Sequence, residues 1–311
     1  MPTEHAAVRV VHKPWGVGDL QPWSSVDGSD HAVGELWFER ADKEAPTPAL
    51  LLKLLFTSEP LSIQVHPDDT YARAMGMPNG KSEAWYILSA QPEAQIGVGL
   101  KHQVTPQQLR ASIRNNSIAE LMHWRPAAKG DVIYIPAGTI HAIGAGIVLV
   151  EIQQNSDATF RLFDYGRQRE LHEDNGVAVA HPWPLRTPGN STRLTTERTV
   201  LIASKHFVLE RIELPEGSSW ALLAELETWM LVLDGHAAIG LAAASIGETI
   251  FIAGVRTSIE VGNNGLSALI AYPASRPIEA LLQRLSEQQD NAVDPIPPAI
   301  PQLEGSEEAR T

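Results

Sequence analysis

The sequence predicts a mainly β protein built from two related β-barrels, with a few helices inserted in or flanking the first. Short apolar and β-branched runs recur between turns that contain Gly or Pro, which is typical of a barrel or a sandwich. At 311 residues the chain is long enough for two domains. Segments of the first half also recur in the second half, which favours two copies of one unit.

Strand-like runs account for much of the first half. The runs are Leu50–Phe56, Ser62–Val65, Glu83–Leu88, Asp131–Ile135, Ile147–Gln153 and Phe160–Phe163. The first of them contains a charge, Lys53, in an otherwise apolar stretch. We expect this lysine either to face the barrel interior or to extend toward the strand end.

Helix signals are fewer than strand signals. Thr105 is followed by Pro106 and Gln108, which together provide an N-cap, a proline in the first turn and a capping box. This helix is expected to continue to Leu121 with a break at Asn115-Asn116. A shorter helix is expected directly after His66, and another over Ile278–Leu285.

Two pairs of segments indicate an internal repeat. Glu83–Leu88 (EAWYIL) resembles Glu227–Val232 (ETWMLV), and Gly130–Gly138 (GDVIYIPAG) resembles Gly247–Gly254 (GETIFIAG). Two related barrels would produce this pattern.

The second copy has no histidine where His66 and His141 stand in the first. We therefore expect a metal-binding domain with a helical insertion at residues 1–185 and a second domain without metal ligands at residues 186–285. The Pro-rich and polar segment 286–311 is expected to be extended or disordered.

Composition excludes several classes of function. The chain has no cysteine, so disulfides and thiolate metal sites are excluded. Its formal net charge of −13 disfavours a nucleic-acid partner, and a phosphate-bearing ligand would need a local basic pocket. No apolar run is long enough to span a membrane and the first residues lack a signal-peptide core, so we expect a cytoplasmic protein without a membrane partner.

Four residues have the spacing of a metal site. Gln64 and His66 are two residues apart, so their side chains share one face of a strand, and Lys81 and Glu83 have the same relation. His141 begins a strand after a Pro-Ala-Gly turn. Two imidazoles, a carboxylate and an amide oxygen suit a borderline divalent cation with open positions for water or substrate. The sequence therefore predicts a metal site at Gln64, His66, Glu83 and His141.

Two cationic residues are candidates for catalysis. Arg161 ends a polar, strand-flanked segment and is expected at the same barrel mouth, where a guanidinium would stabilise an enediolate. Lys81 would act as a proton-transfer base if burial near the metal lowered its pKa. A hydroxide supplied by the metal site is the alternative base.

The motifs also resemble a known family. Gly130–His141 matches the second cupin motif, Gly-x5-Pro-x-Gly-x2-His, although the usual closing Asn is Ala145 here. With Gln64–Asp68 (QVHPD), Gly80–Tyr86 (GKSEAWY) and Glu151–Arg161 (EIQQNSDATFR) in order, the chain resembles type I mannose-6-phosphate isomerase in its short bacterial form, over roughly residues 10–275.

The resemblance implies two cupin (jelly-roll) barrels and one Zn²⁺ per chain. It implies zinc ligands at Gln64, His66, Glu83 and His141, active-site roles for Arg161 and Lys81, and phosphate-binding roles for Ser62 and Arg167. The implied reaction interconverts mannose 6-phosphate and fructose 6-phosphate through a cis-enediol. The family's Trp-Gly-Gly appears here as Trp15-Gly16-Val17, a departure that is expected to reshape the sugar pocket.

Two other functions are compatible with these residues. His66, Glu83 and His141 would also suffice for an Fe(II) cupin oxygenase. A non-catalytic sugar-binding cupin is the other alternative. The amide ligand Gln64 and the cationic pair Lys81 and Arg161 disfavour the first, and the complete metal set disfavours the second.

Overall fold

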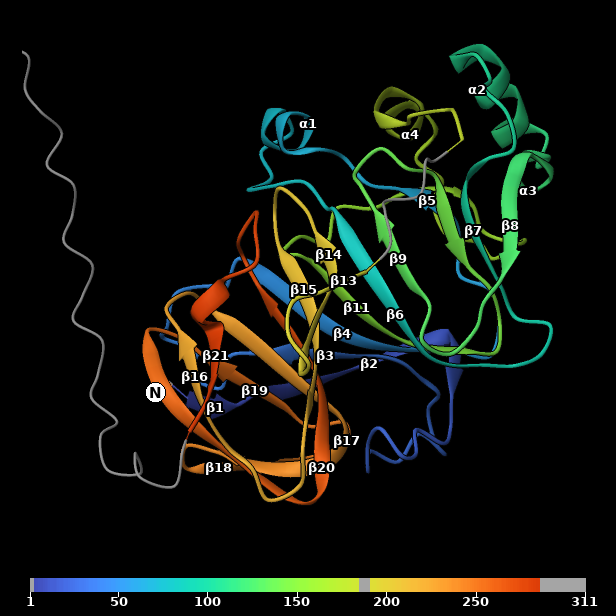
Figure 1. Cartoon of the computed structure of the whole chain (residues 1–311). Helices are drawn as coiled ribbons and strands as arrows, with labels where there is room; N and C mark the ends of the chain where they lie inside the picture. Colours follow the sequence, from blue (N-terminus) through green and yellow to red (C-terminus); the bar gives the residue numbers. More distant parts are fainter. Residues whose placement is uncertain (1–2, 185–190, 286–311) are drawn as a thin grey trace, which may run out of the picture.

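Strands dominate the residues that the computed structural model describes, 3–184 and 191–285, and they form two barrels that pack against each other (Figure 1). The strands of the first barrel are β2 (Ala7–Val17), β3 (Val33–Glu39), β4 (Leu50–Thr57), β5 (Ile63–Val65), β6 (Glu83–Ala90), β7 (Gln95–Leu100), β8 (Met122–Pro126), β9 (Val132–Ile135), β10 (His141–Ile143), β11 (Ile147–Gln154) and β12 (Phe160–Phe163). All six strand runs predicted for the first half are present.

Two antiparallel sheets face each other in the first barrel. One has the order β2-β3-β4-β11-β6-β9 and the other the order β12-β5-β10-β7-β8. Apolar side chains from both sheets meet between them, among them Trp85 and Leu149 from the first and Ile96 and Ile143 from the second. This core supports one end of the barrel interior and leaves the polar residues of β5, β6 and β10 at the other.

Within the described ranges, a single curled sheet of ten strands forms the second barrel. Its strands are β1 (Thr3–His5), β13 (Thr192–Arg193), β14 (Arg198–Ala203), β15 (Val208–Leu214), β16 (Ser219–Ala224), β17 (Thr228–Ile239), β18 (Ala242–Ser245), β19 (Thr249–Ile252), β20 (Val255–Tyr272) and β21 (Leu282–Arg284). β1 pairs with β19, so the first strand of the chain joins the second barrel. The predicted domain boundary at 185/186 and the predicted tail 286–311 lie outside the described residues.

The two barrels share an apolar interface. Leu52 and Ile152 on the outer face of the six-stranded sheet pack with Trp229 and Phe251 of the second barrel. Consequently β4 is buried on both faces along its whole length. A strand covered on both sides has a nearly continuous apolar sequence, which explains the run LLLKLLFT.

Helices cover the outer face of the five-stranded sheet (Figure 1). α2 (Pro106–Arg114) begins with the predicted capping box, and the chain breaks at Asn115-Asn116 before α3 (Ile118–Leu121). α1 (Asp69–Ala74) follows His66 as predicted. α4 (Glu173–Val179) was not predicted, because only Gly176 of this short helix is buried and the sequence lacks an apolar stripe. None of the helices in the described ranges has the length and apolarity needed to cross a membrane.

The helix predicted at Ile278–Leu285 is wrong. A single 3₁₀ turn, η1 (Glu279–Leu281), is followed by β21, which pairs with β16. The buried guanidinium of Arg198 donates hydrogen bonds to two carbonyls of this turn. Pairing with a distant strand therefore outweighs the local helical preference of the segment.

Candidate metal centre

Strand pairing brings the predicted site residues to one level of the first barrel. In the five-stranded sheet, Gln64 on β5 lies opposite His141 on β10 and opposite Arg161 on β12. Residues that lie directly opposite on antiparallel strands project from the same face. His66 follows β5, and Glu83 begins β6 in the facing sheet. The site is therefore assembled from both walls of the barrel.

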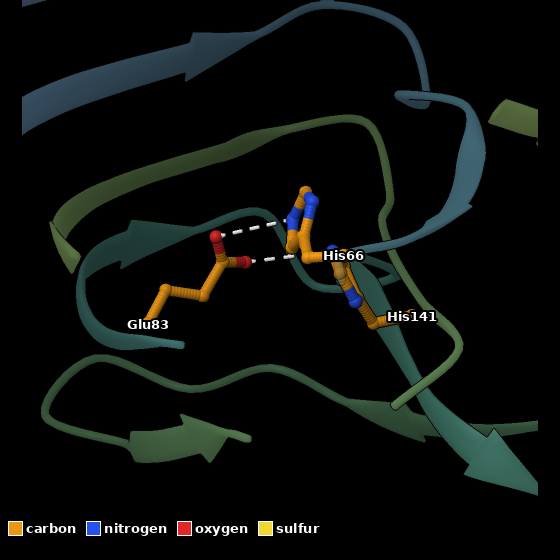
Figure 2. Close-up of side chains that lie close together, drawn as sticks. All are labelled: His66, Glu83 and His141. Atoms are coloured by element: carbon orange, nitrogen blue, oxygen red, sulfur yellow. Dashed lines mark ion pairs between the residues drawn. The ribbon is translucent and has the colours of Figure 1, made fainter. Parts of the chain in front are cut away.

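His66, Glu83 and His141 form a buried group of potential metal ligands (Figure 2). Nε2 of His66 lies 3.3 Å from Glu83 Oε2, and Nε2 of His141 lies 3.4 Å from Glu83 Oε1. One ligand atom from each residue lies within 4.8 Å of the other two. All three residues are at most 1% exposed. The prediction that His66 and His141 converge inside the barrel is confirmed.

Backbone carbonyls fix the orientation of both imidazoles. Nδ1 of His66 donates to the carbonyl of Ala158 at 2.8 Å, and Nδ1 of His141 donates to the carbonyl of Thr139 at 2.9 Å. A nitrogen whose partner is a carbonyl must carry the proton, so each neutral ring directs the Nε2 lone pair toward Glu83. Metal-ligating histidines are held in this way.

The electrostatics of the group leave its donor atoms unprotonated at neutral pH. Burial, together with the neighbouring Lys81 ammonium, lowers the pKa of His66 to about 4. Burial also lowers the pKa of His141. Burial by itself raises the pKa of Glu83, but the Lys81 ammonium and His66 outweigh it and hold that pKa well below its usual range. Two lone pairs and a carboxylate thus face one another in the buried interior of the barrel.

The donor set fits a divalent metal. Oε1 of Glu83 is buried and accepts no hydrogen bond from any residue in the described ranges. A buried carboxylate oxygen without a donor is costly unless a cation neutralises it. Nitrogen and oxygen ligands in this combination suit Zn²⁺.

Gln64, the predicted fourth ligand, lies beside the group. Its amide nitrogen is 3.3 Å from Nε2 of His141, and its amide oxygen accepts a hydrogen bond of 3.1 Å from the Ser62 hydroxyl. Rotation of the amide by 180° exchanges its nitrogen and oxygen. Ser62, predicted near the phosphate, is thus in contact with the metal-binding end of the site.

Lys81 lies against the same group. Its ammonium is 3.0 Å from Nε2 of His66, forms an ion pair with Glu83 and lies 3.8 Å from Oε1 of Glu151. Burial alone would lower the pKa of Lys81, but the two carboxylates outweigh it and raise that pKa. The role of Lys81 as the proton-transfer base stays a prediction.

A polar cavity of about 230 Å³ lies next to the group. Predicted residues in its lining are Ser62, Gln64, Lys81 and Arg161, and further polar residues in it are Lys13, Trp15, Glu35, Lys53, Glu151, Asp157, Thr159 and Arg169. The lining carries five cationic side chains and three carboxylates. A chain of net charge −13 thus has a local basic pocket, which the sequence analysis required for a phosphate-bearing ligand.

Arg167, the other predicted phosphate ligand, is not among the residues that line this cavity. It donates to the carbonyl of Pro60 at 2.6 Å and lies 3.5 Å from the Glu59 carboxylate. Arg169 lines the cavity instead. Both arginines belong to the same Gly-Arg-Gln-Arg segment, and the sequence pattern cannot tell which of them turns inward.

Glu151 is a site residue that the sequence analysis did not select. It is 5% exposed, lies 3.4 Å from Lys53 and accepts a hydrogen bond of 3.1 Å from the Trp85 indole. Glu151 and Lys53 are directly opposite on β11 and β4. The isolated charge of Lys53 within an apolar strand was the signal that could have indicated a buried carboxylate partner.

The fold and the site define a protein of two β-barrels whose first barrel carries a buried His-Glu-His group suited to a divalent metal. A scan against models of protein families finds no match for the chain. Its sequence is 37% identical over 171 residues to the mannose-6-phosphate isomerase of Streptococcus mutans. This aligned region covers 51% of this chain and 53% of that protein. The chain therefore aligns with about half the length of this curated relative.

Solved structures extend the similarity to most of the chain. The crystal structure of mannose 6-phosphate isomerase from Bacillus subtilis has a TM-score of 0.77 and 22% identity, covering 88% of this chain and all of that one. A structure described as zinc-bound mannose 6-phosphate isomerase has a TM-score of 0.67 and 14% identity over 88% of this chain. The predicted cupin fold and the predicted resemblance to mannose-6-phosphate isomerases are both confirmed.

Proposed function

We propose that this protein is a zinc-dependent aldose-ketose isomerase that interconverts mannose 6-phosphate and fructose 6-phosphate. The observation that carries this proposal is a buried His-Glu-His group that adjoins a basic cavity. The relatives named above support the choice of sugar phosphate, and the zinc-bound neighbour supports the choice of metal.

Zinc would be held by His66, Glu83 and His141, with Gln64 as the fourth ligand. When bound there, Zn²⁺ would polarise the substrate oxygens on the two carbons that exchange the proton. The neighbouring ammonium of Lys81 and the guanidinium of Arg161 would hold the negative charge that develops on those oxygens.

Glu151 is the best candidate for the proton carrier, since it is a carboxylate in the cavity wall between two lysines. It would take the proton from C2 of the aldose. The electron pair of the broken C2–H bond then forms the C1–C2 double bond, and O1 gains a proton. Return of the carbon-bound proton to C1 and loss of the proton from O2 would then give the ketose. The cis-enediol is the intermediate of this exchange.

The two alternatives make different predictions. An Fe(II) oxygenase would consume oxygen and lose activity when zinc replaces iron, and the cationic cavity lining disfavours it. A sugar-binding protein would bind the sugar phosphate without turnover.

The test is conversion of mannose 6-phosphate to fructose 6-phosphate by the purified protein. Chelation should abolish the conversion, and stoichiometric Zn²⁺ should restore it. Full conversion by metal-free protein would exclude the zinc mechanism. A protein that binds one zinc and still converts no mannose 6-phosphate would exclude the proposed activity.

A further inference from the structure

The segment that begins in β12 carries more positive charge than its own carboxylates neutralise. Arg161, Arg167 and Arg169 lie within nine positions, and the buried carboxylate among them is Asp164. Arg161 forms no ion pair within the part of the chain that the structure describes, and its buried Nε has no hydrogen-bond partner there. Burial, followed by the charges of Arg169 and Arg167, lowers the pKa of Arg161. A bound anion would relieve this repulsion.

Arg169 is held rigidly at the cavity. Its Nε lies 2.7 Å from Oδ2 of Asp164 and its Nη2 lies 2.5 Å from Oδ1, so the two groups form a bidentate pair. Asp164 is 3% exposed. The pair uses one edge of the guanidinium, and the other edge has no partner among the described residues. A planar guanidinium fixed in this way is suited to a phosphate.

Trp15 supports the same guanidinium. The Arg169 guanidinium carbon lies 4.9 Å from the centre of the Trp15 ring, and the Lys13 ammonium lies 5.4 Å from it. Trp15 is 4% exposed, yet its buried indole Nε1 donates to no acceptor within the described residues. An anion at this position would meet two cations and would lie beside an unused donor.

Arg169 and Lys13 lie closer to the protein surface than the lysines beside the His-Glu-His group. The side chains of Lys53 and Lys81 in the same cavity are 5% and 4% exposed, whereas those of Lys13 and Arg169 are 30% and 29% exposed. A sugar whose reacting carbons lie at the buried His-Glu-His group would therefore extend its other end toward Arg169.

We propose that Arg169 is the principal phosphate-binding residue of this chain, in place of Arg167, and that Asp164 is the residue that positions it. The identity of the substrate rests on the function proposed above, whereas binding of a phosphate group at Arg169 can be tested without it. Trp15 and Lys13 complete the site.

The test compares arginine variants of the full zinc-loaded chain. Inorganic phosphate binding, measured by calorimetry, should weaken about 10-fold to 100-fold in Arg169→Gln, which loses a charge-assisted hydrogen bond. KM for mannose 6-phosphate should rise by a similar factor, and by more than kcat falls. Arg169→Lys should lie between, because it keeps the charge and loses the bidentate geometry.

Positioning by Asp164 has its own readout. Asp164→Asn should raise KM for mannose 6-phosphate with little change in kcat, and this effect should vanish in the Arg169→Gln background. Equal losses in both backgrounds would make Asp164 merely structural. Arg110→Gln, which alters an arginine of α2 outside the cavity, is the matched control and should behave like the wild type.

Several results would overturn the inference. One is a wild-type protein that binds no phosphate, and another is phosphate binding that survives in Arg169→Gln but is lost in Arg167→Gln. Wild-type protein that binds phosphate through Arg169 but does not isomerise would contradict only the proposed function. Isomerisation with an unchanged KM in Arg169→Gln would contradict only the present inference.

Discussion

Glu83 and Glu227 begin the same short motif in the two barrels, yet their side chains face opposite ways. Glu83 lies opposite Ile135 and projects into the first barrel toward the histidines. Glu227 instead accepts hydrogen bonds from the backbone amides of Ala49 and Leu50, at 2.7 and 2.9 Å, and so leaves its own barrel to contact the first.

A one-residue difference in register explains the reversal. In the first barrel Trp85 pairs with Ile133, whereas in the second Trp229 pairs with Phe251 rather than with Ile250, the residue equivalent to Ile133. Such a slip turns every side chain of the strand to the other face. Trp85 therefore packs inside its barrel and Trp229 packs between the barrels. A repeated motif thus carries a candidate metal ligand in one copy and an interface contact in the other.

Of the substitutions that distinguish the two barrels, removal of a proposed metal ligand should have the largest effect. His141→Ala should abolish zinc binding and reduce turnover by more than the roughly 100-fold seen when only a supporting group is lost. His236→Ala, in the second barrel, is the matched control and should leave both unchanged. Zinc content and turnover are the measurements, and retained stoichiometric zinc in His141→Ala would contradict the site.

Substitution of Glu151, on the polar inner wall of the first barrel, should have the second-largest effect. Glu151→Gln should keep zinc and lower kcat by about 10²-fold to 10⁴-fold, the usual range for loss of a general base. Metal analysis and initial rates measure this. If kcat stays at the wild-type value, proton transfer must use another group.

Arg161 tests the cationic side of the same wall. Arg161→Ala should leave zinc bound and lower kcat by about 100-fold, because it removes one donor to the developing negative charge. An unaltered kcat would remove Arg161 from the mechanism. Arg161 lies opposite Gln64 on the neighbouring strand, so local unfolding around Arg161 would disturb the metal site. A loss of zinc in this variant would therefore indicate local unfolding, which the melting temperature would detect.

The interface role of Glu227 should produce the smallest effect. Glu227→Ala should lower the free energy of unfolding by about 1–3 kcal/mol, because the backbone amides of Ala49 and Leu50 lose their charged acceptor. Zinc affinity should not change. The neighbouring exposed Glu225→Ala should have no effect on either quantity. Denaturant unfolding measures the difference, and a loss of zinc from Glu227→Ala would show that this glutamate acts on the metal site.

The sequence by itself determined the features that depend on nearby residues. The two-residue spacing of Gln64 and His66 and the turn before His141 identified side chains that the fold brings together. The capping box at Thr105 identified the start of α2. Each of these depends on atoms a few positions apart, so the chain specifies them before any distant contact forms.

Only the tertiary structure decided the features that depend on distant partners. It turned Arg169 rather than Arg167 into the cavity and brought Glu151 between Lys53 and Lys81. It also made a strand of the segment after Glu279 and set the register that reverses Trp229. In each case several local conformations are close in energy, and contacts with residues far along the chain select one of them.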